Sequence, residues 1–451
     1  MMIKTELNNT HYPTRPAHLW GKMKELRRWH FRKTWEAQAR GAPVIQGIVQ
    51  SFQGYLSGLG EFANPSYGPY YTMMMRRHED NIKCHEAMEA RGWGRDLCSS
   101  MRLHLGQMFR GLSTRGPNGD TVIPNFVFQY VGCHSMGKTG QLFTEHLGVP
   151  FYPFDVPYEE TPESHEYLVT QLAEGIEWME KHTGIKYDDE KAVEGAKNEW
   201  ECYSLLTKIF LECQNIPSPW DYRQLWSLRL PAVTMRHEAA VVEYLRELLD
   251  ETRDRVQDGV SARGYEKVRL IHDGIPPFYR INLLRYPAEY GAIIVGGPLV
   301  FGFGTWRYAP DGSMLPVGSL EEEGKVIKTR EDVLQTAADI YIRYRWNAFS
   351  CCVSRPEHLV KMVEEWHCQG AVIHEDRGCK AEQCAMGEGK LALQEAGVPT
   401  MVYEASQADP RDFSESQVWD RFDSFLESYG LTRVDVEDGY DGGDAVTGSD
   451  G

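Results

Sequence analysis

The stretch Gly370–Ser406 reads GAVIHEDRGCKAEQCAMGEGKLALQEAGVPTMVYEAS, and it decides the fold. An apolar run at 371–374 is typical of a buried strand, residues 383–396 have a helical pattern, and residues 400–404 read as a second strand. This order predicts a βαβ unit, because two parallel strands need a crossover helix between them. Cys379 then lies between a strand end and a helix start, the sheet edge where α/β proteins bind ligands.

A second stretch repeats this arrangement in the first half of the chain. Residues 122–131 (VIPNFVFQYV) read as a strand, GCHSMGKTG and a helix follow, and residues 150–156 supply the next strand. Cys133 occupies the place that Cys379 has in the other unit. Cys98 lies at the start of a further predicted helix, whose first turn can be capped by Asp96 or Ser99.

The two units predict an α/β protein with two Rossmann- or flavodoxin-like parallel-sheet domains joined by a helical segment, because residues 159–259 are mostly helical in pattern. Five units are expected along the chain: a helical extension at 1–40, a first α/β domain at 41–160, a helical linking region at 161–261, a second α/β domain at 262–432, and a disordered acidic tail at 433–451.

The overall charge limits the classes of partner. A net charge of −17 argues against binding to nucleic acid or to anionic membranes, both of which need a basic surface. No run approaches the roughly 20 apolar residues of a membrane span, and the first residues have no apolar signal region, so a cytoplasmic location is expected. A basic, aromatic helical stretch at 19–40 is either a packing helix with a solvated cationic face or a dock for an acidic partner or phosphorylated ligand.

Ten cysteines in a chain of this length favour metal or redox roles over structural disulfides in a reducing compartment. None forms a CxxC pair, so a site has to be assembled from distant segments. Thiols at Cys98, Cys133 and Cys379 suit an iron–sulfur cluster with one open iron, or zinc with His134 or His374 as the fourth ligand. An unremarkable set of buried thiols is the third interpretation.

Residues 132–139 also match the phosphate-binding pattern GxxxxGK(S/T), with a strand before and a helix after. In such a loop Lys138 would contact the β- and γ-phosphates of a nucleotide and Thr139 a magnesium ion. A strand that ends in the second, magnesium-binding Asp does not stand out. This interpretation is therefore the weaker one.

Five segments of the chain resemble the 2-hydroxyacyl-CoA dehydratase/benzoyl-CoA reductase family. They are RDLCSSMRLHLGQM at 95–108, FVFQYVGCHSMGK at 126–138, PFYPFDVPY at 150–158, GAVIHEDRGCK at 370–380 and VPTMVYEASQADPRDFSESQVWDRFDSFLE at 398–427. The resemblance covers most of residues 40–430 in the right order. It displaces the phosphate-loop interpretation, because it implies that ATP is used by partner subunits and not by this chain.

The resemblance implies that Cys98, Cys133 and Cys379 are ligands of a 4Fe–4S cluster in the cleft between the two domains. Three further thiols, Cys351, Cys352 and Cys384, could add ligands or make the cluster larger. The implied chemistry also needs a proton donor and contacts to the substrate. Candidate proton donors are His134, His374 and Glu375, and the alternative for each is a hydrogen bond to cluster sulfide. Candidate contacts to the coenzyme A phosphates are Arg377 and Lys380, and the alternative is that both are solvated loop charges.

In length and detail the chain looks most like the larger subunit of the active-site module of ATP-dependent benzoyl-CoA reductases. Such a subunit would pair with a homologous second subunit. It would receive low-potential electrons from an ATPase activator module with its own 4Fe–4S cluster, with ferredoxin as the indirect donor, and would reduce an aromatic acyl-CoA to a cyclic dienoyl-CoA. The alternatives are a subunit of a 2-hydroxyacyl-CoA dehydratase and an electron-relay or scaffold subunit of the same complex.

Overall fold

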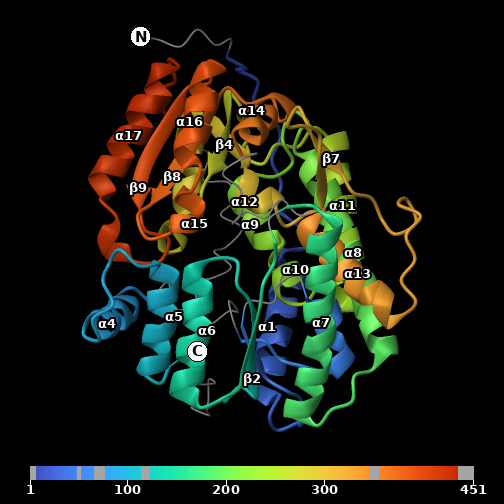
Figure 1. The fold of residues 1–451 in the computed structure, drawn as a ribbon. Helices are drawn as coiled ribbons and strands as arrows, with labels where there is room; N and C mark the ends of the chain where they lie inside the picture. Colours follow the sequence, from blue (N-terminus) through green and yellow to red (C-terminus); the bar gives the residue numbers. More distant parts are fainter. Residues whose placement is uncertain are drawn as a thin grey trace.

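The computed structural model describes residues 7–47, 52–65, 77–112, 122–157, 159–344 and 355–434. It confirms the α/β class, with two parallel sheets that are surrounded and joined by helices (Figure 1). In the residues described, no helix has both the length and the apolar character that crossing a bilayer requires.

The first sheet has the strand order β1-β2-β3 and is parallel throughout. Its strands are β1 (Ile45–Gln46), β2 (Phe126–Tyr130) and β3 (Phe151–Phe154). Helix α6 (His134–Leu147) crosses from β2 to β3, which confirms the βαβ unit predicted here. Every residue of β2 is buried, as expected of the central strand of a covered parallel sheet.

The second sheet has the order β5-β4-β8-β9 and is also parallel. Its strands are β4 (Val268–Asp273), β5 (Ala292–Gly296), β8 (Gly370–Asp376) and β9 (Thr400–Ala405). Between β8 and β9 the chain forms α15 (Lys380–Gln383) and α16 (Met386–Glu395). The βαβ unit predicted from Gly370–Ser406 is therefore confirmed, with its crossover split into two helices.

The remaining elements are helical apart from one short hairpin of β6 (Trp306–Tyr308) and β7 (Met314–Pro316). The helices are α1 (Trp20–Glu36), α2 (Gln53–Leu56), η1 (Ser57–Leu59), α4 (His78–Glu89), α5 (Ser99–Phe109), α7 (Pro162–Thr183), α8 (Asp189–Glu212), α9 (Tyr222–Leu228), α10 (Leu230–Thr234), α11 (Ala239–Gln257), η2 (Phe278–Tyr290), α12 (Pro298–Phe301), α13 (Arg330–Ile342), α14 (Arg355–Glu365), η3 (Pro410–Asp412) and α17 (Glu415–Ser428).

One helix starts later than its sequence pattern predicts. The pattern predicts a helix over 321–345, but α13 begins at Arg330. The Thr329 side chain accepts from the Asp332 backbone N–H while the Asp332 carboxylate accepts from that of Thr329, and this reciprocal cap fixes the start. The prediction is wrong for the first nine residues because their charged pattern also suits turns.

Helix α8 joins the two hydrophobic cores. Ala196 and Trp200, from its first half, pack into the core around the first sheet, and Leu206 and Phe210 pack into the core around the second. Helix α13 packs into the first core, although it comes from the later part of the sequence. In Figure 1 the second sheet lies above α5 and α6, with α9 and α12 near the centre of the molecule.

Candidate functional site

Three cysteines stand immediately before helices. Cys98 is the N-cap residue of α5, Cys133 of α6 and Cys379 of α15. Cys133 follows β2 and Cys379 follows β8, so both lie at the carboxyl edge of a parallel sheet. The structure thus places each thiol at the start of a helix, as the sequence predicts.

Burial and backbone hydrogen bonds act on these thiols in opposite directions. Burial raises the pKa of Cys98 to about 12, raises that of Cys133, and raises that of Cys379 well above its usual value. Backbone N–H groups of the helix starts oppose this, since they favour a thiolate. The donors are Ser100 and Met101 for Cys98, Ser135 and Met136 for Cys133, and Glu382 for Cys379.

Cys98 lies close enough to both other thiols to interact with them electrostatically. After burial, charge on Asp376 and on Cys133 adds to the rise in the pKa of Cys98, and charge on Cys98 adds to that of Cys379. The backbone agrees, because a Cβ on Gly378 would lie 3.5 Å from the Cα of Cys98 and 3.1 Å from the carbonyl oxygen of Leu97. Segments from both halves of the chain therefore meet at these cysteines.

Among the described residues, no three His, Cys, Asp or Glu side chains gather closely enough to hold a single metal ion. In a 4Fe–4S cluster the four irons occupy alternate corners of a cube, so the protein ligands are spaced more widely than those of one ion. Three thiols, each with N–H donors behind it, are the donor set that iron–sulfur clusters use. The residues present therefore fit such a group better than a lone zinc ion.

Asp376 is a buried carboxyl group that the sequence reasoning missed. It follows Glu375 at the end of β8, and burial raises its pKa to about 6. Its Oδ1 accepts from the Gly378 backbone N–H at 3.0 Å and its Oδ2 from that of Gln407 at 3.3 Å. It lies three residues before Cys379 on the buried side of the strand, and only its burial distinguishes it from the loop charges beside it.

His374 and Glu375 lie on opposite faces of β8. His374 is fully buried, its Nδ1 pairs with the carbonyl oxygen of Ile275, and its ring stacks on Tyr403 with centroids 4.8 Å apart. Burial lowers the pKa of His374 to about 4, so the ring is neutral near pH 7. Glu375 is exposed. Their roles as proton donors stay predictions.

The other charged candidates are on the surface. His134 is the exposed first residue of α6. Arg377 pairs with Glu404 at 2.6 Å across two exposed side chains, and Lys380 Nζ donates to the carbonyl oxygen of Arg377 at 3.3 Å. The roles of Arg377 and Lys380 at coenzyme A stay predictions.

The roles of Cys351, Cys352 and Cys384 as additional ligands stay predictions. Cys384 is an exposed residue at the end of α15 and is disulfide-bonded in the structure. Cys351 and Cys352 lie outside the described residues.

The structure does not favour a phosphate-binding loop at 132–139. Helix α6 already begins at His134, and the Thr139 hydroxyl donates to the Ser135 carbonyl oxygen inside that helix.

A buried ionic network ties the first half of the chain to the second beside Cys98. Both terminal nitrogens of Arg102 on α5 donate to Asp409 at 3.2 Å, and neither side chain is exposed. Arg411 pairs with Asp409 at 2.7 Å and with Glu89 of α4 at 2.5 Å. Arg411 holds the pKa of Asp409 below its usual range against the effect of burial, which raises it. The network fixes α4 and α5 against the segment after β9.

Cys379 packs against an apolar and aromatic wall. Ile275 and Leu299 pack with Cys379 in one buried cluster, and Trp226 and Phe278 pack against it. The Trp226 and Phe278 rings lie 5.3 Å apart. This wall is formed by α9, α12 and the segment after β4, and it limits the access of water to the thiol.

Residues 69–429 match the family model described as 2-hydroxyglutaryl-CoA dehydratase, D-component. The chain belongs to this family. The matched range contains all three cysteines, the buried ionic network and the aromatic wall.

Relatives within the family act on different acyl-CoA esters. The chain is 28% identical to the alpha chain of the (R)-phenyllactyl-CoA dehydratase of Clostridium sporogenes over 74% of its length and 76% of the relative. It is 26% identical to one of the subunits of the benzoyl-CoA reductase of Thauera aromatica over 75% of its length and 78% of the relative. It is 24% identical to the alpha chain of the (R)-2-hydroxyglutaryl-CoA dehydratase of Acidaminococcus fermentans over 66% of its length and 58% of the relative.

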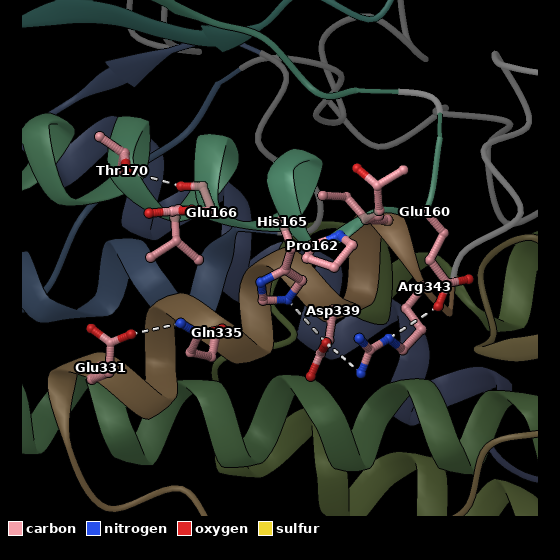
Figure 2. Close-up of a pocket in the computed structure, with 12 residues that line it drawn as sticks. Glu160, Pro162, His165, Glu166, Thr170, Glu331, Gln335, Asp339 and Arg343 are labelled. Carbon is pink, nitrogen blue, oxygen red and sulfur yellow. Dashed lines mark hydrogen bonds and ion pairs between the residues drawn. The ribbon is translucent and has the colours of Figure 1, made fainter.

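This family member also has a groove of about 810 Å³ between α7 and α13, lined mainly by polar side chains (Figure 2). Its charges largely pair with one another. His165 Nε2 lies 3.0 Å from Asp339 Oδ1, and Arg343 contacts both Asp339 at 3.4 Å and Glu160 at 3.2 Å. The groove therefore contributes surface ion pairs and no additional thiol.

Proposed function

We propose that Cys98, Cys133 and Cys379 hold a 4Fe–4S cluster, and that the chain is the iron–sulfur subunit of an enzyme that reduces an aromatic acyl-CoA, as in benzoyl-CoA reductases. The observation that carries this proposal is the close approach of the loop of Cys379 to that of Cys98, where a Cβ on Gly378 would lie 3.5 Å from the Cα of Cys98. The electrostatic interaction of Cys98 with both other thiols supports it. Family membership supports the acyl-CoA substrate class.

The electrostatics of the site suit a cationic iron centre. Burial keeps the three thiols protonated when no cation is near, so binding of iron has to release protons and gain from the N–H donors of three helix starts. A bound cluster would supply single-electron transfer. The wall around Trp226 and Phe278 would exclude water and offer flat rings to an aromatic acyl group.

The partners belong to the same proposal. The relatives are named as subunits, and both the alpha and the beta chain of one dehydratase are among them, which supports a homologous second subunit for this chain. We further propose an ATPase activator module with its own 4Fe–4S cluster as the electron source, with ferredoxin before it and ATP used only by the activator. The seven free cysteines of the described residues suit a reducing compartment such as the cytoplasm, and the disulfide-bonded Cys384 is the exception.

A second candidate reaction is dehydration of a 2-hydroxyacyl-CoA. It is favoured by the 28% identity to a phenyllactyl-CoA dehydratase subunit, whose named substrate is also aromatic. The two reactions differ in their electron balance. A reductase consumes reductant with every product formed, whereas a dehydratase makes no net redox change and needs electrons only for priming.

The test is an anaerobic assay of the purified complex with benzoyl-CoA and with phenyllactyl-CoA, following reductant and product together. The proposal predicts stoichiometric oxidation of the reductant with benzoyl-CoA. Turnover of phenyllactyl-CoA with catalytic amounts of reductant, and none of benzoyl-CoA, would establish the dehydratase instead. A complex that turns over neither ester would leave this chain an electron-relay or scaffold subunit.

A further inference from the structure

Arg229 is a buried cation at the junction of α9 and α10, near the centre of the molecule (Figure 1). Arg229 is only 2% exposed to solvent. Its Cζ lies 3.8 Å from the ring centroid of Trp226 and 3.8 Å from that of Phe303. Burial lowers the pKa of Arg229 to about 9, which still leaves it charged at neutral pH.

Arg229 has no counter-charge among the described residues. No carboxylate there lies within ion-pair distance of it, its guanidinium donates no hydrogen bond to them, and its Nε is enclosed without a partner. Other buried arginines differ: Arg102 pairs with Asp409, and Arg269 pairs with Glu266 at 2.5 Å. Since an unpaired buried charge is costly, Arg229 has the features of a group held for a ligand.

A second unpartnered donor accompanies it on the same helix. The hydroxyl of Tyr222 is buried and makes no hydrogen bond to the described residues. Charge on Arg229 acts on this hydroxyl, and so does that on Glu382, which also acts on Cys379. Tyr222 stacks on Trp226 with centroids 6.1 Å apart.

The two donors lie beside the thiol site. Trp226 is the link, because its ring contacts the guanidinium of Arg229 and also packs against the cluster of Ile275, Leu299 and Cys379. An acyl group seated against Trp226 would therefore lie near both Cys379 and Arg229. The ring of Trp226 thus contacts the two donors, Arg229 and Tyr222, and also packs against the cluster that contains Cys379.

We propose that Arg229 and Tyr222 bind the carbonyl oxygen of the acyl thioester and so orient the acyl group toward Cys379. This inference rests on the proposed acyl-CoA function. A thioester oxygen can accept from both donors, and it would gain negative charge on one-electron reduction of the acyl group, the chemistry that a bound cluster would supply. An enclosed cation at that point favours the reduced form over the neutral one.

The same two donors could instead bind a carboxylate at the far end of the acyl chain. Three ligands distinguish a thioester oxygen from a terminal carboxylate: benzoyl-CoA, S-benzyl-CoA, which lacks the carbonyl oxygen, and glutaryl-CoA, which carries a terminal carboxylate. Their Kd values are measured anaerobically on the full chain in the wild type and in Arg229→Gln, Arg229→Lys and Tyr222→Phe. Arg255→Gln is the control, because Arg255 is also buried on a ring, Trp220 at 4.1 Å, but donates to the carbonyl oxygen of Pro219 at 3.0 Å.

The proposal predicts that Arg229→Gln weakens benzoyl-CoA binding about tenfold to a hundredfold, the range of a charge-assisted hydrogen bond, and leaves S-benzyl-CoA nearly unchanged. Arg229→Lys should recover part of the loss, and Tyr222→Phe should lose less. A loss confined to glutaryl-CoA would overturn the thioester assignment and place a carboxylate there. Wild-type Kd values for all three ligands in Arg229→Gln would overturn the site itself.

Thermal unfolding controls for effects of the substitutions on folding, and iron content controls for the proposed function. Removal of an unpaired buried charge should leave the thermal midpoint of the ligand-free chain unchanged or higher in Arg229→Gln, whereas Arg255→Gln should lower it. A midpoint that falls equally in both variants would make Arg229 a structural residue and overturn the proposal. Iron is measured on the same samples, so an iron-free wild type would sink the cluster while the Kd comparison would still test Arg229.

Discussion

His272 should make the stability of the chain fall in acid. It is fully buried at the end of β4, its Nε2 lies 2.9 Å from the hydroxyl of Tyr403, and burial lowers its pKa to about 3. Between about pH 6.5 and pH 3 the unfolded chain binds a proton on this residue that the folded chain does not. The free energy of unfolding should therefore fall with falling pH by about 1.4 kcal/mol per pH unit from this residue.

The measurement is the free energy of unfolding from urea titrations at about pH 6 and about pH 5 in the wild type and His272→Gln. The glutamine can keep a hydrogen bond to Tyr403 but cannot titrate, so its loss of stability between the two pH values should be smaller by about 1.4 kcal/mol. Equal slopes in the two proteins would show that His272 is not neutral in the folded state.

The sequence pointed to the three cysteines because each precedes a predicted helix, and two of them, Cys133 and Cys379, also follow a predicted strand. Asp376 and Arg229 gave no such signal. A carboxylate between Glu375 and Arg377 looks like loop charge, and only burial marks it out. Arg229 is an arginine within a helical stretch, and the absence of a partner among the described residues is a property of the fold.

At the scale of elements, the approach of two loops depends on Gly378. A Cβ at this position would lie 3.1 Å from the Leu97 carbonyl oxygen and 3.3 Å from the Ser99 backbone nitrogen. Gly378→Ala should push the loop of Cys379 away from that of Cys98 and lower the iron content of the purified chain. Gly387→Ala in α16 is the matched control, because nothing lies within 4 Å of its Cβ.

Gly387→Ala should keep full iron and gain up to about 1 kcal/mol of stability from its helical position. Iron analysis and thermal unfolding of both variants make the comparison. Equal iron in the two would mean that the two loops can separate without affecting the site.

The buried network between α5 and the segment after β9 should matter more for stability than any surface pair. Asp409→Asn would leave Arg102, whose side chain is 0% exposed, without its full counter-charge. Breaking one side of a buried pair costs ~3–5 kcal/mol. Glu404→Gln breaks the exposed pair with Arg377 and should cost less than about 1 kcal/mol. Denaturation midpoints compare the two, and similar losses would contradict the buried role of Asp409.

The elements themselves were predictable where the sequence pattern has one interpretation. One apolar run predicted β2 and another predicted β8, since strands buried on both faces read as nearly continuous apolar segments. The β6–β7 hairpin was not predicted, because strands of three residues are too short to show an alternating pattern of apolar and polar residues. The late start of α13 depended on the Thr329 cap, which competes with equally polar turns before it.

At the scale of the whole molecule, the sequence indicated two sheets and the cysteine at each sheet edge, but not how they meet. The contact of Gly378 with Cys98 and the pairing of Arg102 with Asp409 join residues about 280 and 307 positions apart. No local pattern encodes such pairings. Helix α8, with one end in each core, holds the halves in this arrangement. The expected unit boundaries at 40, 160, 261 and 432 stay predictions.

The measurement that tests the central claim most directly is iron and acid-labile sulfide per chain, after anaerobic purification, in the wild type and in Cys98→Ser, Cys133→Ser and Cys379→Ser. Cys368→Ser is the control, because that thiol lies just before the amino end of β8, away from the site. The account predicts about four irons and four sulfides in the wild type and the control, and a large loss in each of the other three. A wild type with zinc and no sulfide, or a Cys379→Ser variant with its full iron, would contradict it.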